Sequence, residues 1–214
     1  MKRKPYIIAI EGNDGAGKST IVKLLSKYLK SKNYKVRVLR YNMSFTTLPA
    51  IKEGKRRKFS PVVNTLLHFL SVVDQQERLY HNIDFVIWDR YKYSVYSRGK
   101  ARRTDVSVLN FILEYCSVPD ITIYLDITPE LSLKRLNGAY NYWESGQDIY
   151  PHLSKEKSFL KFQNNVREEF IKILSKNDNS FFINISDERT KRDIFSECVN
   201  ILKKSEIERN IWKR

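Results

Sequence analysis

The chain has 214 residues, enough for one sizeable α/β domain, and we expect a single domain over residues 1–214. Its 39 lysines and arginines exceed its 24 acidic residues, and the resulting formal net charge of +15 suits anionic partners such as nucleotides or nucleic acid. No segment approaches the roughly 18 apolar residues of a membrane span, and the start MKRKP lacks the apolar core of a signal peptide. Two cysteines, Cys116 and Cys198, are too few for a disulfide framework or a zinc site. We therefore expect a cytoplasmic protein without membrane contact, with both cysteines in the core.

A glycine-rich loop near the start of the chain fills the pattern G-x-x-x-x-G-K-[ST] between a predicted strand, 6–10, and a predicted helix. The backbone N–H groups of such a loop can surround a polyphosphate, and the helix behind it adds the positive end of its dipole. Lys18 would reach the β and γ phosphates, and the Ser19 hydroxyl would ligate the Mg²⁺ that bridges them. The residues expected to bind the polyphosphate are Gly12, Asn13, Gly15, Ala16, Gly17, Lys18, Ser19 and Thr20.

A second predicted strand, 35–40, ends at Arg40, on the edge where open α/β sheets bind ligands, so Arg40 is a candidate for substrate binding. Residues 42–60 are expected to form a loop with at most one helical turn. The basic run 52–58 in this loop is expected to be solvated, the alternative being contact with a ligand. An apolar helix beginning at Pro61 follows, in which Phe69 lies in the core or faces a base.

The next strand, 85–88, brings Asp89 and Arg90 to the same edge of the sheet. Such an acid can hold the shell of a Mg²⁺ ion and the adjacent arginine can bridge phosphates, although a surface ion pair is the alternative. Residues 92–103 are rich in Tyr, Ser, Lys and Arg but lack apolar periodicity, so we expect a functional loop there. A helix is predicted to start at Asp105.

The rest of the chain continues the alternation of strands and helices. Segment 137–154 is aromatic and polar without an apolar face, which is typical of a lid, and we expect one there. The remaining predicted elements are a strand at 121–126, a helix capped by Thr128, a helix over 159–173, a strand at 181–185 and a helix over 194–202. This alternation predicts an α/β fold with a five-stranded parallel sheet and helices on both faces.

Two further motifs follow the glycine loop and are more specific than the loop itself: Asp-Arg-Tyr-x-x-Ser at 89–94 and Pro-Asp-x-x-x-x-Leu-Asp at 119–126. Together with Trp-Glu-Ser-Gly-Gln-Asp at 143–148, they resemble the thymidylate kinase family of P-loop nucleoside monophosphate kinases. The branch is the one whose lid carries an aromatic-Glu-small-Gly-x-Asp element. The resemblance implies a P-loop NTPase fold, a homodimer, and the transfer of a phosphoryl group from ATP to dTMP with Mg²⁺.

The same resemblance implies roles for individual residues. Lys18, Asp89 and Arg90 would be catalytic, with Ser19 and Asp89 at the Mg²⁺. Arg135 would lie against adenine, Asp14 would contact the sugar 3′-hydroxyl, and Phe69 would stack on thymine. The other residues expected to bind the monophosphate are Arg40, Tyr41, Gln75, Arg78, Arg90, Ser94, Arg98 and Trp143.

The chain departs from the family pattern at three places, one of which is the short connection between Arg78 and Asp89. It has Gln75 where many members carry an arginine that binds the monophosphate, and residues 138–154 contain no arginine, although related members supply a catalytic arginine from the lid. Lys134, Arg135, Lys155 or Arg98 would have to supply that charge.

Three other functions stay open. The chain could phosphorylate another nucleoside monophosphate, which Gln75 and Trp143 allow, or it could bind nucleotides without catalysis. A basic P-loop ATPase that binds nucleic acid is the alternative from another class. We expect no nucleic-acid partner, because the sequence contains no second domain and no basic groove with regularly spaced aromatic residues.

Overall fold

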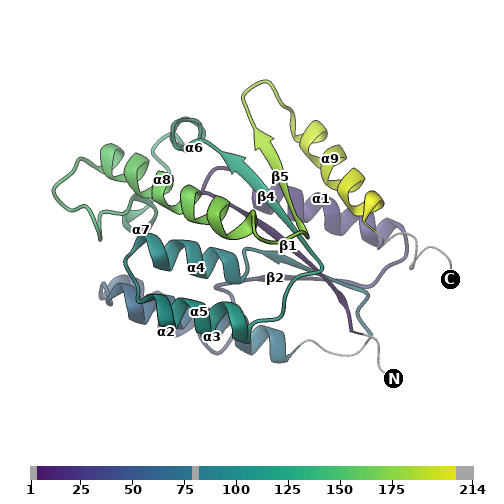
Figure 1. The fold of residues 1–214 in the computed structure, drawn as a ribbon, viewed down its shortest axis with the longest axis horizontal. Coiled ribbons are helices and arrows are strands. Elements are labelled where there is room, and N and C mark those ends of the chain that lie inside the picture. The colour runs from purple at the N-terminus through teal and green to yellow at the C-terminus, as the bar shows by residue number, and fades with distance from the viewer. Residues whose placement is uncertain (1–3, 79–81, 206–214) are drawn as a thin grey trace.

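One parallel sheet lies at the centre of the structure, a computed structural model that describes residues 4–78 and 82–205 (Figure 1). Its strands are β1 (Tyr6–Gly12), β2 (Val36–Arg40), β3 (Phe85–Asp89), β4 (Ile121–Ile127) and β5 (Ser180–Ile185), in the order β2-β3-β1-β4-β5. β3 is buried along its whole length, as expected for a central strand of a parallel sheet covered on both faces. β1 lies between β3 and β4, so the later strands add to the sheet on both sides of β1. Open α/β sheets bind ligands at such a point, and a crevice is expected at the carboxyl end of β1.

Helices cover both faces of the sheet (Figure 1). They are α1 (Lys18–Ser31), α2 (Leu48–Arg56), α3 (Pro61–Glu77), α4 (Lys92–Ala101), α5 (Val106–Tyr115), α6 (Pro129–Leu136), α7 (Tyr142–Ser145), α8 (Lys155–Leu174) and α9 (Lys191–Lys204). Side chains of α1 and α9 pack on one face, and side chains of α3, α4, α5 and α8 pack on the other. Alternate residues of β1 supply the two cores, because Ile8 and Ile10 face α1 whereas Ala9 faces α3.

These features confirm the predicted α/β fold with five parallel strands and helices on both faces. Cys116 and Cys198 are buried and free, as expected for core residues. Within the described ranges, no helix is long and apolar enough to cross a membrane. Lysines and arginines are frequent at both ends of the sequence, at 2–4 and 203–214, and these stretches lie largely outside the described residues.

The predicted loop at 42–60 is wrong in part, because residues Leu48–Arg56 form the helix α2. The helix presents only a short buried side to α3, made by Ile51 and Gly54, which is too little apolar sequence to show a helical period. A Cβ atom on Gly54 would lie 2.9 Å from the Asn64 Oδ1 atom of α3, so the two helices approach closely there. Most of the basic run 52–58 is exposed.

The predicted loop at 92–103 is also wrong, because most of it forms α4. This helix packs against α3, α5 and α8, so most of its surface is buried, and several of the buried side chains are polar. Ser94 and Ser97, for example, have no exposed surface. A helix that is buried on several sides and lined by serine and tyrosine has no apolar stripe, which explains why its periodicity was absent from the sequence.

Candidate active site

The glycine-rich loop lies at the carboxyl end of β1 and leads into α1. Gly12, Gly15 and Gly17 all have positive φ angles, and a Cβ atom on Gly12 would lie only 2.6 Å from the Leu125 carbonyl oxygen. The Lys18 ammonium crosses the loop and donates to the Asn13 carbonyl oxygen. Burial, and then the positive charge of Arg90, lower the pKa of Lys18 to about 7. An anion bound in the loop would therefore favour the charged form of this lysine.

The two predicted Mg²⁺ ligands meet directly. Ser19 Oγ donates to Asp89 Oδ2 at 2.6 Å, and Arg40 Nε lies 3.4 Å from the same carboxylate oxygen. A hydroxyl and a carboxylate are hard oxygen ligands, which Mg²⁺ prefers. The part of the chain that the structure describes holds no cluster of three or more His, Cys, Asp or Glu residues suited to a metal. This donor set fits Mg²⁺, which keeps several waters and takes further oxygens from phosphates.

Asp14, inside the loop, joins two arginines from α4 and the turn before it. It forms ion pairs with Arg90, through Oδ1, and with Arg98 Nη1, which lies 3.0 Å from Oδ2. Burial opposes ionisation, but Arg98, Arg90 and Lys18 hold the pKa of Asp14 well below its usual range. Asp14 is therefore a fixed negative charge that orients both arginines.

Arg90 is held in place by its backbone as well as by Asp14. Its φ angle of 68° lies in the left-handed region, which a non-glycine residue seldom adopts. Its N–H donates to the Ile10 carbonyl oxygen at 3.0 Å, and Nη1 donates to the Gly12 carbonyl oxygen at 2.9 Å. The strained turn thus directs the guanidinium group from the end of β3 towards the glycine loop.

Glu11 positions the beginning of α4, a role that the sequence analysis missed. Its carboxylate is fully buried and accepts from the backbone N–H groups of Tyr91 at 2.9 Å and Ser94 at 3.2 Å, and from the Ser94 hydroxyl. Burial raises the pKa of Glu11, whereas these hydrogen bonds favour its charged form. The only signal in the sequence was an acid within an otherwise apolar strand. Ser94 and Arg98 are four residues apart on α4, so they lie on one side of that helix, and both line the cavity.

Segment 137–154 packs against α4 and α8. Arg102 Nε lies 2.7 Å from Asp148 Oδ2, and Arg102 Nη2 donates to the Trp143 carbonyl oxygen at 2.5 Å. From α8, Gln163 Nε2 donates to the Glu144 carbonyl oxygen at 2.9 Å and to Asp14 Oδ2 at 3.0 Å. Gln163 therefore connects this segment with the glycine loop.

These groups open onto one cavity of about 410 Å³. The predicted site residues that line it are Asp14, Gly15, Gly17, Lys18, Ser19, Thr20, Arg40, Tyr41, Asp89, Arg90, Ser94, Arg98 and Trp143. Lys55 also lines the cavity, from the basic run 52–58 for which contact with a ligand was the alternative prediction. Further lining residues had no predicted role, including Asn64, Thr65, His68, Arg102 and Glu144. Together with Lys55, most of these come from α2 and α3 or the end of α4, so only the packing of these helices brings them together.

The other predicted site residues lie outside this lining. Gly12, Asn13 and Ala16 are buried within the glycine loop. Gln75 Nε2 donates to the Arg40 carbonyl oxygen at 2.7 Å, and Arg78 forms an ion pair with Asp74 at 2.9 Å.

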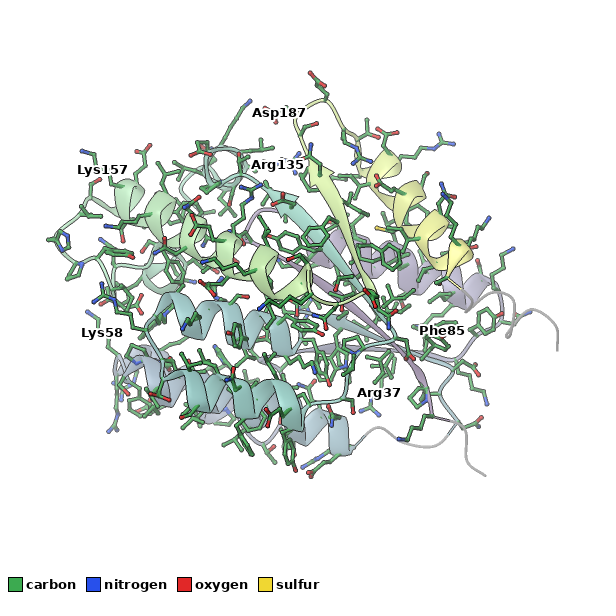
Figure 2. All side chains as sticks on the ribbon, in the orientation of Figure 1. Arg37, Lys58, Phe85, Arg135, Lys157 and Asp187 are labelled. Carbon is green, nitrogen blue, oxygen red and sulfur yellow. The ribbon has the colours of Figure 1, made fainter. Side chains whose placement is uncertain are left out.

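Arg135 also lies outside the cavity lining. Its Nη2 donates to the Ser186 carbonyl oxygen at 3.0 Å, and Figure 2 shows Arg135 near Asp187, beyond the carboxyl ends of β4 and β5. The next residue, Leu136, lines the cavity. The predicted contact of Arg135 with adenine stays a prediction.

Phe69 lies among core residues, outside the cavity lining, and its stacking on a base stays a prediction. It is 6 % exposed, and its ring makes edge contacts with Phe111 and Tyr115 of α5, with centroid separations of 5.7 and 5.8 Å. One residue corresponds to about 100° of rotation around a helix, so α3 directs His68 to the cavity and Phe69 to the core.

Among the four candidates for the missing lid arginine, Arg98 alone lines the cavity. Lys134 forms an ion pair with Asp187 at 2.6 Å, and Lys155 lies over the ring of Tyr140 at 4.4 Å from its centroid. Arg98 is 12 % exposed and is held by Asp14, so its charge is directed into the site.

Comparisons with known proteins agree on one family. The family described as thymidylate kinase matches residues 10–196. The probable thymidylate kinase 2 of Saccharolobus solfataricus is 30 % identical over 204 residues, covering 92 % of this chain and 94 % of that protein. The thymidylate kinase of Caldanaerobacter subterraneus subsp. tengcongensis is 33 % identical over 178 residues, covering 78 % and 85 % respectively. A solved structure of thymidylate kinase from Candida albicans, 20 % identical, has the same fold with a TM-score of 0.71 over 94 % of this chain and 92 % of that chain.

Proposed function

The chain belongs to the thymidylate kinase family, and from that premise we propose that it transfers the γ-phosphoryl group of ATP to dTMP, giving ADP and dTDP. The observation that carries the proposal is one cavity bordered by two sets of anion-binding groups. The glycine loop with Lys18 suits the polyphosphate of ATP, and Arg40 with Arg90 suits the phosphate of the acceptor. A donor and an acceptor nucleotide bound there would face each other across the carboxyl end of β1.

Positioning and charge neutralisation account for the chemistry. An oxygen of the acceptor phosphate forms the new bond to the γ-phosphorus, the bond from that phosphorus to the β–γ bridging oxygen breaks, and ADP leaves with the electron pair. Lys18 and Arg90 neutralise the charge that spreads over the transferred group, and Asp14 keeps Arg90 oriented. Because the acceptor phosphate is already ionised at neutral pH, no general base is needed.

We propose that Ser19 and Asp89 hold Mg²⁺ when nucleotides are bound. Their contact at 2.6 Å supports this assignment, since the same two oxygens could each turn to a cation between them. When bound, the ion would neutralise charge on the β and γ phosphates. Arg40, 3.4 Å from Asp89, would link this group to the acceptor phosphate.

We propose that Arg98 supplies the positive charge that related members take from the lid. Its contact with Asp14 and its place in the cavity lining support this role. In the same proposal, residues 1–214 form one kinase domain, and segment 137–154 is a lid that excludes water from the transferred group. The bonds from Arg102 and Gln163 to the backbone of this segment support the closed position of the lid.

A homodimer is the assembly that we propose, through the outer face of α3 and α5. Large apolar side chains are exposed on this face, namely Leu66, Leu70, Phe111 and Tyr115. An exposed cluster of this kind is typical of a protein–protein contact. Sedimentation at several protein concentrations would test it, and a monomer at all of them would contradict it. A cytoplasmic location stays a prediction.

The test of the function is ADP production from Mg²⁺-ATP with each of the common deoxyribo- and ribonucleoside monophosphates. We expect turnover with dTMP, and Lys18→Ala should abolish it because no other lysine reaches the bound phosphates from the glycine loop. Turnover with a different monophosphate alone would identify another substrate for the same phosphoryl-transfer mechanism. ATP hydrolysis that depends on DNA, without any monophosphate activity, would refute the kinase and favour the nucleic-acid-binding ATPase.

A further inference from the structure

The end of the cavity at α2 and α3 is bordered by side chains with no assigned role. α4 begins near the glycine loop, where Glu11 caps it, and its last turn carries Gly99 and Arg102 to the other end of the cavity. Lys55 from α2 and His68 from α3 line this end as well. A monophosphate whose phosphate lies at Arg40 and Arg90 would extend its base in this direction.

His68 is a histidine ring placed against an aromatic wall of the cavity. Its centroid lies 4.9 Å from that of Tyr41, with an angle of 57° between the rings. His68 Nδ1 is buried and has no hydrogen-bond partner among residues 4–78 and 82–205. An unpaired polar atom beside a ligand cavity is commonly satisfied by the ligand or by water.

The charges around His68 are mainly cations. Burial is the larger cause, and nearby positive charges the smaller one, of a pKa of His68 that is lowered to about 3. The ring is therefore neutral at neutral pH. The cations that contribute are Lys55, Arg98, Arg102 and Arg90. Glu144 of α7 also lines the cavity, but its Oε2 atom already accepts from the Asn141 N–H at 2.9 Å.

We propose that His68 contacts the base of the acceptor nucleotide and, with Lys55, selects bases that present a carbonyl oxygen over bases that present an amino group. The inference rests on the proposed function and names what distinguishes its substrates. A neutral imidazole can stack on a planar base and can donate or accept one hydrogen bond. Of the two neighbouring rings on α3, His68 lines the cavity and Phe69 packs in the core.

The preference for a carbonyl edge follows from the donors at this end. A lysine ammonium and an arginine guanidinium only donate hydrogen bonds, so they can satisfy the O4 atom of thymine or uracil but not the N4 amino group of cytosine. Arg102 is partly neutralised by Asp148, which leaves Lys55 as the more available cation. An amino group directed at Lys55 would place two donors against each other without an acceptor, which costs affinity.

The test compares dUMP and dCMP, which differ in the base at position 4 and the adjacent ring nitrogen, together with dTMP. We expect the wild type to favour dTMP and dUMP over dCMP. His68→Ala should raise the KM for dTMP about tenfold or more with a smaller change in kcat, and should reduce the dUMP-to-dCMP ratio of kcat/KM. His68→Phe keeps a stacking ring but no ring nitrogen, so it should keep much of the affinity and lose discrimination. The KM for ATP should stay unchanged in both variants.

Lys55 has a matched control one turn earlier on the same helix. Lys55→Ala should lower the dUMP-to-dCMP ratio several-fold, whereas Lys52→Ala removes an equal charge from an exposed position outside the cavity lining and should leave the ratio unchanged. Equal effects of the two lysine variants would show a general electrostatic effect and would overturn the role of Lys55.

The outcomes separate the inference from the function on which it rests. If the wild type phosphorylates no monophosphate, the proposed function fails. If the wild type is active and His68→Ala keeps the same KM for dTMP and the same ratio, the function stands and the inference is overturned. Should His68→Ala fail to fold, an unchanged ratio in His68→Phe overturns the inference equally.

Discussion

Gln163 connects the proposed lid with the glycine loop, and the variant Gln163→Met tests that connection. The side chain is fully buried, and its Nε2 atom donates to Glu144 O at 2.9 Å and to Asp14 Oδ2 at 3.0 Å. Methionine has a similar length and flexibility but no donor, so the variant removes both hydrogen bonds with little change in volume. Asp14 keeps its ion pairs with Arg90 and Arg98, so the main loss falls on the lid.

The size of the effect follows from the bond to Glu144. A neutral hydrogen bond contributes about 0.5–1.5 kcal/mol, and a buried acceptor left without a partner costs about 1–3 kcal/mol. The Glu144 carbonyl regains water when the lid opens, so the cost applies to the closed state alone. The bond is only partly buried, so we expect the closed lid to lose about 0.5–1.5 kcal/mol relative to the open lid, which corresponds to roughly 2- to 12-fold more open molecules.

Hydrogen exchange of the lid amides measures this change. The N–H groups of Ile149 and Tyr150 both donate to Gly146 O at 2.9 Å, and their exchange should accelerate by that factor if opening exposes them. Asn164→Leu is the matched control, because Asn164 is an exposed neighbour on α8 whose amide donates to Glu168. Unchanged exchange at both amides in a folded Gln163→Met protein would refute the reasoning, as would equal acceleration in Asn164→Leu.

Three further predictions concern the lid and stability. Gly146→Ala should loosen the lid by roughly 2–5 kcal/mol, because φ at Gly146 is +71° and the new Cβ atom would lie 2.4 Å from Phe162 Cβ. Gly138→Ala, where φ is +80° and the space is open, should cost only the backbone strain. Equal hydrogen-exchange rates of the lid amides in the two variants would contradict this prediction. The free energy of unfolding should fall by up to about 2 kcal/mol between pH 7 and pH 5, because the pKa of His68 is about 3 in the folded chain and 6.5 in the unfolded chain, which therefore binds the proton first. In denaturant titrations, His68→Phe should reduce this dependence of the unfolding free energy on pH. The same pH dependence in the variant and the wild type would disprove the shift. Thr128→Ala removes the side-chain cap of α6 and should lower the free energy of unfolding by about 1 kcal/mol in the same titrations, with no change counting against the cap.

Much of the site could be predicted from short patterns, since local sequence determines local geometry. The glycine loop, the strands that end at Arg40 and Asp89, and the parallel sheet all follow from apolar runs and the residues that end them. Parallel strands bring their carboxyl ends to one edge, which is why Ser19 and Asp89, far apart in sequence, were expected to meet.

The helices around the site were harder to predict. α4 lacks an apolar stripe because it is buried on several sides, and its beginning is capped by Glu11 of β1, which is distant in sequence. No pattern within residues 92–103 contains that information. The same limit applies to α2, whose small buried side is visible only against α3.

The sequence by itself determined the chemistry at the phosphate end of the cavity, because a loop that wraps an anion needs glycines, a lysine and a hydroxyl at set spacings along the chain. Only the tertiary structure decided which side chains line the other end of the cavity, at α2 and α3. Whether α3 turns His68 or Phe69 to the cavity depends on its rotation about its own axis, and the packing of Phe69 against α5 decides that rotation. The proposed recognition of the base depends on such long-range packing, whereas the phosphate-binding loop depends on the local course of the backbone.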